Sequence, residues 1–303
     1  MLDSIKFITV KSIKIAYETF GDPSHPAVVL LMGNSAQGLM WDESFCRQLA
    51  ANRYFVIRFD YRDTGLSTCL DYDSHPYNLD DLTQDVLALM DQLSIERAHF
   101  IGLSMGGAIA QLLALYHLPR VLTISLMMTS PDLSVKNNAF KGIRSSHAML
   151  PPPSADFIQQ VIEINKCPAA NDAEKLQQLI DNWRLANGGK APFDDSYWRN
   201  LLGETMKREA ANPTARDLKF ANLGNHSKAQ MASPEPNLEV IRKIDCPCLI
   251  IHGEEDPIFP VEHAKALEDG IRNSRFHLIK TMGHALNPCF FEEMISAIHG
   301  HLA

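Results

Sequence analysis

The chain of 303 residues lacks the features that mark several large classes of protein. Acidic residues outnumber basic ones, 36 against 28, which gives a formal net charge of −8, and no run of lysine and arginine offsets this balance. We therefore expect no nucleic-acid partner, because binding to a polyanion depends on clustered positive charge. The longest wholly apolar run, residues 27–32, is far too short to cross a bilayer, so no membrane association is expected either.

Cysteine is sparse, and only Cys246 and Cys248 among the six lie close together. A separation of one residue is too short for an ordinary disulfide, and no second pair completes a zinc site. The sequence also has no phosphate-binding loop and no dinucleotide motif, so we expect no cofactor and no resident metal. Reduced thiols, together with an N-terminus that alternates polar and apolar residues unlike a signal peptide, predict a cytoplasmic protein.

Apolar runs that alternate with helical patterns predict a mostly parallel sheet. Two alternating segments near the N-terminus indicate a hairpin, and the later, continuous apolar runs are typical of parallel strands covered on both faces. The predicted strands are 5–10, 13–20, 27–32, 54–60, 98–103, 121–128, 248–252 and 276–280. The helices predicted between and after them are 79–93, 105–117, 261–270 and 290–302.

The strand pattern is interrupted once, from about residue 134 to residue 236. This stretch contains four helix-like pieces, at 154–166, 173–187, 195–210 and 214–224. We therefore predict an α/β fold whose central, mostly parallel sheet is flanked by helices. Residues 1–133 and 237–303 are expected to form this core, and residues 134–236 a helical cap inserted after the sixth strand.

Three glycines surround one serine where a predicted strand gives way to a predicted helix. The residues Gly102-Leu103-Ser104-Met105-Gly106 match the pattern G-x-S-x-G, which in this context places a nucleophile on a tight turn. Glycines two residues either side of Ser104 keep the neighbouring chain clear of it. The N-terminus of the following helix offers free N–H groups to a developing oxyanion. Glycines that serve packing alone are the alternative interpretation of the same motif.

A serine nucleophile needs a histidine base and an acid to orient it. In an architecture with the serine between a strand and a helix of such a sheet, the chain order is serine, acid, histidine. Asp256, in the stretch "HGEEDPIFP" after a late strand, is the candidate acid, with Glu255 as runner-up and Asp132 as a third possibility. His284, in "TMGHALNP", follows the last strand in the right order and is the candidate base.

An oxyanion hole requires two backbone N–H donors. Met105 directly follows the serine and supplies one, and Asn34 in the loop "MGNSAQG" is the best candidate for the other. Gly33 beside it allows the substrate a close approach. Met32 and Met128 fall at predicted strand ends near these groups, where flexible thioether side chains favour an adaptable apolar substrate site.

Two other groupings of polar residues have competing interpretations. The loop "YRDTGLST" offers Arg62 or Asp63 to a substrate, but we expect Asp60, Arg62 and Ser67 to hold a tight loop with Gly65 at its bend. A metal site is conceivable near the candidate acid, although no established ligand spacing is present. Its ligands would be His252, Glu254, Glu255, Asp256 and His263.

The stretches "GLSMGG", "HGEEDPIFP" and the late "GH", in this order, resemble the α/β-hydrolase superfamily over nearly the full length of the chain. Three longer stretches, "LMGNSAQGLMWDESF", "RFDYRDTGLST" and "TMGHALNP", resemble the branch typified by aclacinomycin methylesterase, a serine carboxylesterase that acts on the methyl ester of an aromatic polyketide. The resemblance implies that Ser104, Asp256 and His284 form the triad. It also implies that Asn34 and Met105 carry the oxyanion hole. Met32 departs from the histidine common before the hole, and Asn34 stands where glycine is frequent.

The expected function is that of a serine carboxylesterase. It would hydrolyse small to medium uncharged esters, methyl esters included, through an acyl-enzyme, with a small-molecule ester as the expected partner. Enol-lactone hydrolysis, C–C bond hydrolysis and cofactor-free perhydrolysis use the same triad and are alternatives. A ligand-binding protein derived from a hydrolase is the alternative from a different class.

Overall fold

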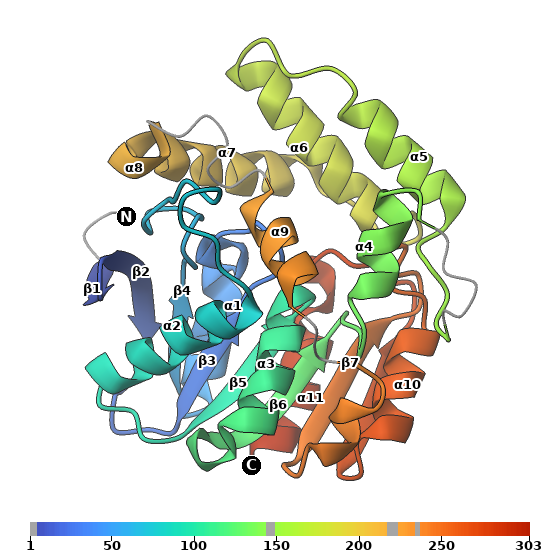
Figure 1. Ribbon diagram of the computed structural model, residues 1–303. Helices are drawn as coiled ribbons and strands as arrows, with labels where there is room; N and C mark the ends of the chain where they lie inside the picture. Colours follow the sequence, from blue (N-terminus) through green and yellow to red (C-terminus); the bar gives the residue numbers. More distant parts are fainter. Residues whose placement is uncertain (1–4, 144–148, 217–223, 234–236) are drawn as a thin grey trace.

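The computed structural model describes residues 5–143, 149–216, 224–233 and 237–303, and its centre is an eight-stranded sheet (Figure 1). The strand order is β1-β2-β4-β3-β5-β6-β7-β8. The first three strands of this order pair antiparallel, and all later neighbours pair in parallel. The strands are β1 Lys6–Val10, β2 Ile13–Phe20, β3 Ala27–Leu31, β4 Phe55–Phe59, β5 Ala98–Leu103, β6 Val121–Met127, β7 Cys248–Gly253 and β8 Ser274–Ile279. The predicted fold class is confirmed.

The central strands are buried along their whole length. Every residue of β3, β5 and β7 is buried, which explains why their sequences are continuous apolar runs rather than alternating ones. The strand β8 at one edge of the sheet buries only its last residue. The hydrophobic core therefore lies on both faces of the middle of the sheet.

Helices cover both faces of the sheet (Figure 1). The helices α2 and α3 pack on each other on one face, and α1 and α11 pack on each other on the opposite face. The helix α10 packs against β7 and β8. Their bounds are α1 Glu43–Ala51, α2 Leu79–Gln92, α3 Met105–Tyr116, α10 Glu262–Gly270 and α11 Phe291–Leu302.

All remaining α-helices of the described ranges lie between β6 and β7. They are α4 Ser134–Phe140, α5 Ala155–Ile164, α6 Asp172–Ala186, α7 Asp195–Ala211, α8 Pro213–Arg216 and α9 Asn225–Ala232. They gather over the end of the sheet at which β5 gives way to α3 (Figure 1). We propose that residues 134–236 form the cap, with the same bounds that the sequence predicts. Of the predicted helix 214–224, the structure describes a single short helix that ends at Arg216, and residues 217–223 lie outside the described residues.

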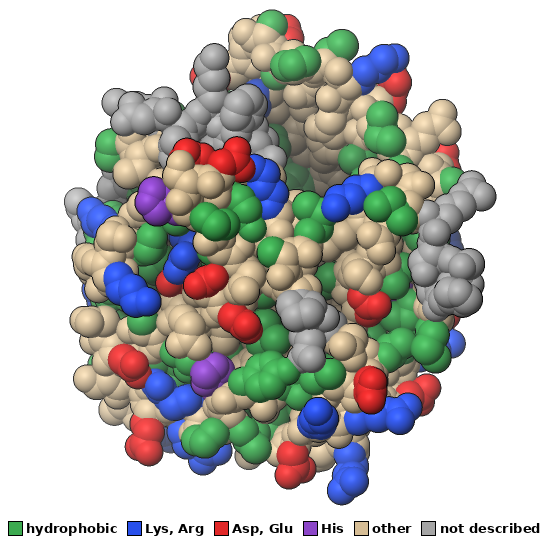
Figure 2. All heavy atoms as spheres, viewed as in Figure 1, with side chains coloured by type: hydrophobic (Ala, Val, Ile, Leu, Met, Phe, Trp, Pro, Cys, Tyr) green, Lys and Arg blue, Asp and Glu red, His purple; other side chains and the backbone are tan. Residues whose placement is uncertain are grey.

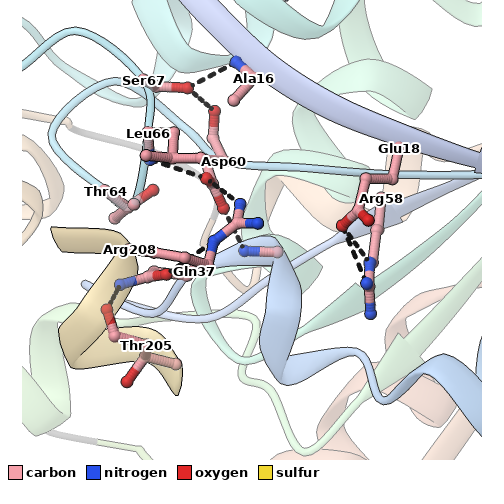
Figure 3. A network of polar contacts seen from close by, with 12 residues as sticks. Ala16, Glu18, Gln37, Arg58, Asp60, Thr64, Leu66, Ser67, Thr205 and Arg208 are labelled. Atoms are coloured by element: carbon pink, nitrogen blue, oxygen red, sulfur yellow. Dashed lines mark hydrogen bonds and ion pairs between the residues drawn. The ribbon is translucent and has the colours of Figure 1, made fainter. Parts of the chain in front are cut away.

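The loop after β4 is held by the side chains of Asp60 and Ser67 (Figure 3). Asp60 accepts hydrogen bonds from the backbone N–H groups of Gly38 (2.8 Å) and Leu66 (2.9 Å), and Ser67 Oγ donates to the Asp60 carbonyl oxygen (2.6 Å). Gly65 has φ +52°, and a Cβ there would collide with the Asp60 carboxylate. These contacts support the structural interpretation of the loop.

Arg62 has a different role from the one expected. Its guanidinium forms two hydrogen bonds, of 2.7 and 2.6 Å, with the carboxylate of Asp85 on α2. The side chain therefore ties the loop to a core helix and does not close the loop on itself.

The Asp60 carboxylate also binds the cap (Figure 3). Arg208 of α7 places Nη2 2.6 Å from Asp60 Oδ2 and donates from Nε to Gln37 Oε1 (3.2 Å). Gln37 in turn donates to the Thr205 carbonyl oxygen at 2.8 Å. The Asp60 side chain is fully buried and that of Arg208 is 11% exposed, so this ion pair joins cap and core away from water.

Arg208→Ala is expected to destabilise the protein by about 3 kcal/mol or more, because it leaves a buried carboxylate without its cation. The free energy of unfolding from chemical denaturation measures the effect. Lys207→Ala is the matched control, since Lys207 is exposed and its ion pair with Glu204 contributes little. A loss for Arg208→Ala no larger than that of the control would contradict the interpretation.

Candidate functional site

Ser104 stands on a sharp turn between β5 and α3. Its backbone has φ 55° and ψ −117°, a strained conformation for a residue other than glycine. The turn is held from both sides, because the Ser104 N–H donates to the Met127 carbonyl oxygen (2.9 Å) and its own carbonyl accepts from Thr129 Oγ1 (2.6 Å). This strain at a strand-to-helix junction is the arrangement that projects a serine hydroxyl above a sheet.

The neighbouring glycines allow the backbone segments to approach closely. A Cβ at Gly102 would collide with the carbonyl oxygen of Gly106, and a Cβ at Gly106 with that of Leu31. At Gly107 it would press into the side chain of Thr129. Larger residues at these positions would push α3 away from the sheet and relax the turn at Ser104.

His284 and Asp256 form a buried pair. His284 Nδ1 lies 2.8 Å from Asp256 Oδ2, and both residues are 6% exposed. The other carboxylate oxygen of Asp256 accepts from the N–H groups of Ile258 (2.8 Å) and Phe259 (2.9 Å). Burial alone would raise the pKa of Asp256, but the charge and hydrogen bond of His284 outweigh it and hold this pKa below its ordinary value. With Nδ1–H donating to Asp256, Nε2 is the basic nitrogen of His284.

The other two candidate acids make different contacts. Glu255 pairs with the exposed Lys190 at 2.5 Å, and Asp132 Oδ1 accepts from the Ser134 N–H at 2.8 Å, at the start of α4. Asp256 therefore stays the candidate acid.

Ser104 and His284 line one cavity of about 260 Å³. In the space-filling view the surface is hollowed below α6 and above α9 and α4 (Figure 2). The cavity lining is Met32, Gly33, Asn34, Ala36, Leu103, Ser104, Lys136, Phe140, Phe157, Val161, Asn182, Trp183, Ala186, Ile258 and His284. Met32 and Gly33 lie where the sequence predicts them. A larger groove of about 940 Å³ beside α4 and α5 is lined by Asp132 but by none of Ser104, Asp256 and His284. The smaller cavity is therefore the candidate site, because it holds the nucleophile and the base.

Met128 does not lie where the sequence predicts it. It is fully buried in the core at the end of β6, and its N–H donates to the Ile251 carbonyl oxygen of β7 at 3.0 Å. It is not among the described residues that line the cavity. The strand end was a correct inference, but the position faces the core and not the cavity.

The two candidate donors of the oxyanion hole flank Ser104. Met105 is the first residue of α3, so its N–H has no acceptor within the helix. On the other side, a Cβ at Gly33 would lie 3.3 Å from the Cβ of Ser104, which places the loop after β3 against the serine. Asn34 follows in this loop and lines the cavity.

Cap helix α9 holds the loop of Asn34. Asn34 Oδ1 accepts from Gln230 Nε2 at 2.7 Å, and the N–H of Ser35 donates to His226 Nδ1 at 3.1 Å. His226 Nε2 binds the Arg62 carbonyl oxygen (2.8 Å), and burial lowers the pKa of this imidazole, which stays neutral. The Asn34 side chain is thus engaged by the cap, and its backbone N–H remains for the hole. Sequence reasoning left His226 open between lining a pocket and exposure to solvent and missed Gln230, because a short polar helix has no periodic apolar pattern.

The alternative metal site finds no support among the described residues. Within them, no three histidine, cysteine, aspartate or glutamate side chains are arranged to hold a metal ion. His252 Nε2 binds the Phe259 carbonyl oxygen at 2.8 Å, and His263 contacts Ser130 Oγ and the Pro151 carbonyl oxygen, each at 2.8 Å. Both ring nitrogens of His263 and the Nε2 of His252 therefore contact protein groups, and the buried Nδ1 of His252 has no hydrogen-bond partner among the described residues.

Residues 26–288 match the family model described as the alpha/beta hydrolase fold. The chain belongs to the α/β-hydrolase family. This membership, expected from the sequence, is therefore confirmed. Among the described helices, none is both long and apolar enough to span a membrane.

Individual relatives agree with this membership. The chain is 33% identical to a rhodomycin D methylesterase of Streptomyces sp. strain C5, over 98% of the chain and 97% of the relative. It is 36% identical to a 3-oxoadipate enol-lactonase of Acinetobacter baylyi, over 96% of the chain and 95% of the relative. In fold it is similar to 2-hydroxy-6-oxo-6-phenylhexa-2,4-dienoate hydrolase from Rhodococcus, with a TM-score of 0.74 and 19% identity, covering 98% and 99% of the two chains. The prediction of a carboxylic ester hydrolase is confirmed by the relationship to the methylesterase.

Proposed function

We propose that this α/β hydrolase is a serine carboxylesterase that cleaves small to medium uncharged esters, methyl esters among them, through an acyl-enzyme. The observation that carries the proposal is the arrangement of three residues. Ser104 on its strained turn and His284 line one cavity, and the imidazole is oriented by the buried carboxylate of Asp256.

The arrangement supports acyl transfer in two steps. His284 Nε2 accepts the Ser104 proton as Oγ attacks the ester carbonyl, and the N–H groups of Met105 and Asn34 bind the oxyanion. The C–O bond to the alcohol then breaks, and the alcohol leaves with the proton from His284. Water, deprotonated by His284, attacks the acyl-enzyme in the same way and releases the carboxylic acid and Ser104.

The cavity supports a modest substrate size. Its volume of about 260 Å³ is just below the range usual for ligand sites, and its cap side is formed mostly by aromatic and aliphatic side chains such as Phe140, Phe157 and Trp183. These side chains favour an acyl or alcohol group with little charge near the ester.

Methyl esters are proposed because of the relationship to the methylesterase, and enol-lactone hydrolysis is the second candidate because of the relationship to the enol-lactonase. Both reactions begin with attack of the serine on a carbonyl carbon. A cytoplasmic location and the absence of a nucleic-acid partner stay predictions.

A graded substrate panel tests the proposal. We expect p-nitrophenyl esters of short to medium acyl length, and methyl esters of similar size, to be hydrolysed with the highest kcat/KM. A preference for an enol-lactone over every open-chain ester would favour the second candidate. Absence of turnover with all of them would contradict the proposed function.

Removal of metal ions is expected to leave the activity unchanged, because the proposed groups are all protein side chains and backbone amides. The measurement is the kcat of the best ester before and after extensive dialysis against EDTA. An activity that is lost on dialysis and restored by one added divalent cation would revive the metal interpretation.

A further inference from the structure

Lys136 of α4 places a charge in the cavity of Ser104 and His284. It is the only lysine, arginine, aspartate or glutamate among the described residues that line this cavity. Most of the other lining residues are apolar, and the remaining polar ones are Asn34, Ser104, Asn182 and His284. The proposed function makes no use of this ammonium group.

The ammonium of Lys136 is held by an oriented amide. Lys136 Nζ donates to Gln230 Oε1 at 3.1 Å. Gln230 is 4% exposed, and its Nε2 donates to Asn34 Oδ1 (2.7 Å) and to the His226 carbonyl oxygen (3.3 Å). Both amide hydrogens are thus directed elsewhere, so the amide oxygen faces the lysine. Gln230 therefore bridges the ammonium of Lys136 and the side chain of Asn34.

The positive charge of Lys136 has no negatively charged partner within the described part of the chain. There, the ammonium makes no ion pair with a carboxylate, and Gln230 takes one of its three N–H donors. Burial lowers the pKa of Lys136 to about 8, so the charged form still predominates at neutral pH. A half-buried cation without an anionic partner is unfavourable, and an anionic ligand would relieve this.

We propose that Lys136 binds an anionic oxygen of the substrate outside the ester group, so that the preferred substrates are esters carrying a second, acidic group. The inference rests on the proposed esterase function. It changes the expected substrate in one respect: the part around the reacting ester is uncharged, and a second group farther from the ester carries a negative charge. A carboxylate and an ionised enol or phenol hydroxyl share the required chemistry. The binding contact is a charge-assisted hydrogen bond from Nζ, strengthened by the apolar walls of the cavity.

Matched substrate pairs measure this preference. The carboxylate arm compares monomethyl esters of dicarboxylic acids of four to eight carbons with the methyl esters of the corresponding ω-carboxamides, which are neutral and of equal size. The hydroxyl arm compares methyl esters of hydroxyaromatic acids with their methoxy analogues. We expect kcat/KM to favour the acidic member by about tenfold or more in the best-fitting pair, mainly through KM.

Substitution of the lysine assigns the preference. In Lys136→Met the ratio within each pair should fall to about one, and Lys136→Arg should keep part of the ratio. Lys141→Met, which removes an exposed cation at the end of the same helix, should leave the ratio unchanged. No preference in either arm, or a preference that persists in Lys136→Met, would overturn the inference.

A binding measurement separates this inference from the proposed function. Calorimetric titration of the same pairs into the Ser104→Ala protein needs no turnover, and the acidic member should bind about tenfold more tightly unless Lys136 is also replaced by methionine. Equal affinities would overturn the inference. A charge preference in binding without hydrolysis by the unaltered enzyme would uphold it and contradict the esterase proposal alone.

Discussion

Replacing Ser104 by alanine is expected to lower kcat for ester hydrolysis by about 10⁴-fold or more while the protein remains folded. In the proposed mechanism Ser104 Oγ forms the bond to the acyl group in the first step, and this bond breaks in the second. No other described serine lines the cavity with His284. The small residual rate would come from binding and from the oxyanion hole. Steady-state kinetics with the best p-nitrophenyl ester give the rate, and circular dichroism and the unfolding midpoint verify the fold.

Ser125→Ala is the matched control for this variant. Ser125 is a fully buried serine of β6, two strand positions from the end of the strand, and its hydroxyl has no hydrogen-bond partner among the described residues. Its loss should leave kcat within a few-fold of the unaltered enzyme. Substantial activity in Ser104→Ala would remove the serine from the mechanism.

Asp256→Asn is expected to lower kcat by about 10⁴-fold with little loss of stability. The amide is nearly isosteric with the carboxylate and can still accept from the N–H groups of Ile258 and Phe259 through its oxygen. It would then present its NH₂ group to His284 Nδ1, which favours the wrong tautomer and removes the negative charge that stabilises the imidazolium. The measurement is kcat across pH 6 to 9, together with the unfolding midpoint.

Glu255→Gln is the control for the acid. Glu255 is adjacent in sequence but pairs with Lys190 at the surface, so its activity should be close to that of the unaltered enzyme. Near-normal activity in Asp256→Asn, with a large loss in Glu255→Gln or Asp132→Asn, would transfer the role of the acid to that residue.

The sheet was predictable because buried parallel strands have a simple sequence pattern. The strands Ile13–Phe20 and Ala98–Leu103 are observed with the predicted bounds, and the other predicted strands are observed with ends shifted by one or two residues. The candidates Ser104, Asp256 and His284 were accessible for a related reason. Each follows the carboxyl end of a strand of the sheet, in the chain order serine, acid, histidine that is typical of this architecture.

The contribution of the cap was not predictable from one sequence. The helix α9 buries Asn225, His226 and Gln230, so it has no apolar stripe that indicates a helix or its inner face. The position of Lys136 in the cavity could not be predicted either, because a single lysine in a polar stretch is most often a surface residue. Which polar side chains of the cap approach Asn34 depends on how α4 and α9 pack over the sheet, and local sequence carries little of that information.

Labelling with a fluorophosphonate tests the central claim most directly, because this reagent reacts with a serine that is activated by a histidine and adjoins an oxyanion hole. The account predicts stoichiometric labelling. Mass spectrometry of the intact protein should show the mass of one bound phosphonyl group, and peptide mapping should locate it at Ser104. The label should be absent from Ser104→Ala and greatly slowed in His284→Ala. Labelling at another residue, or no labelling of an enzyme that hydrolyses esters, would contradict the account.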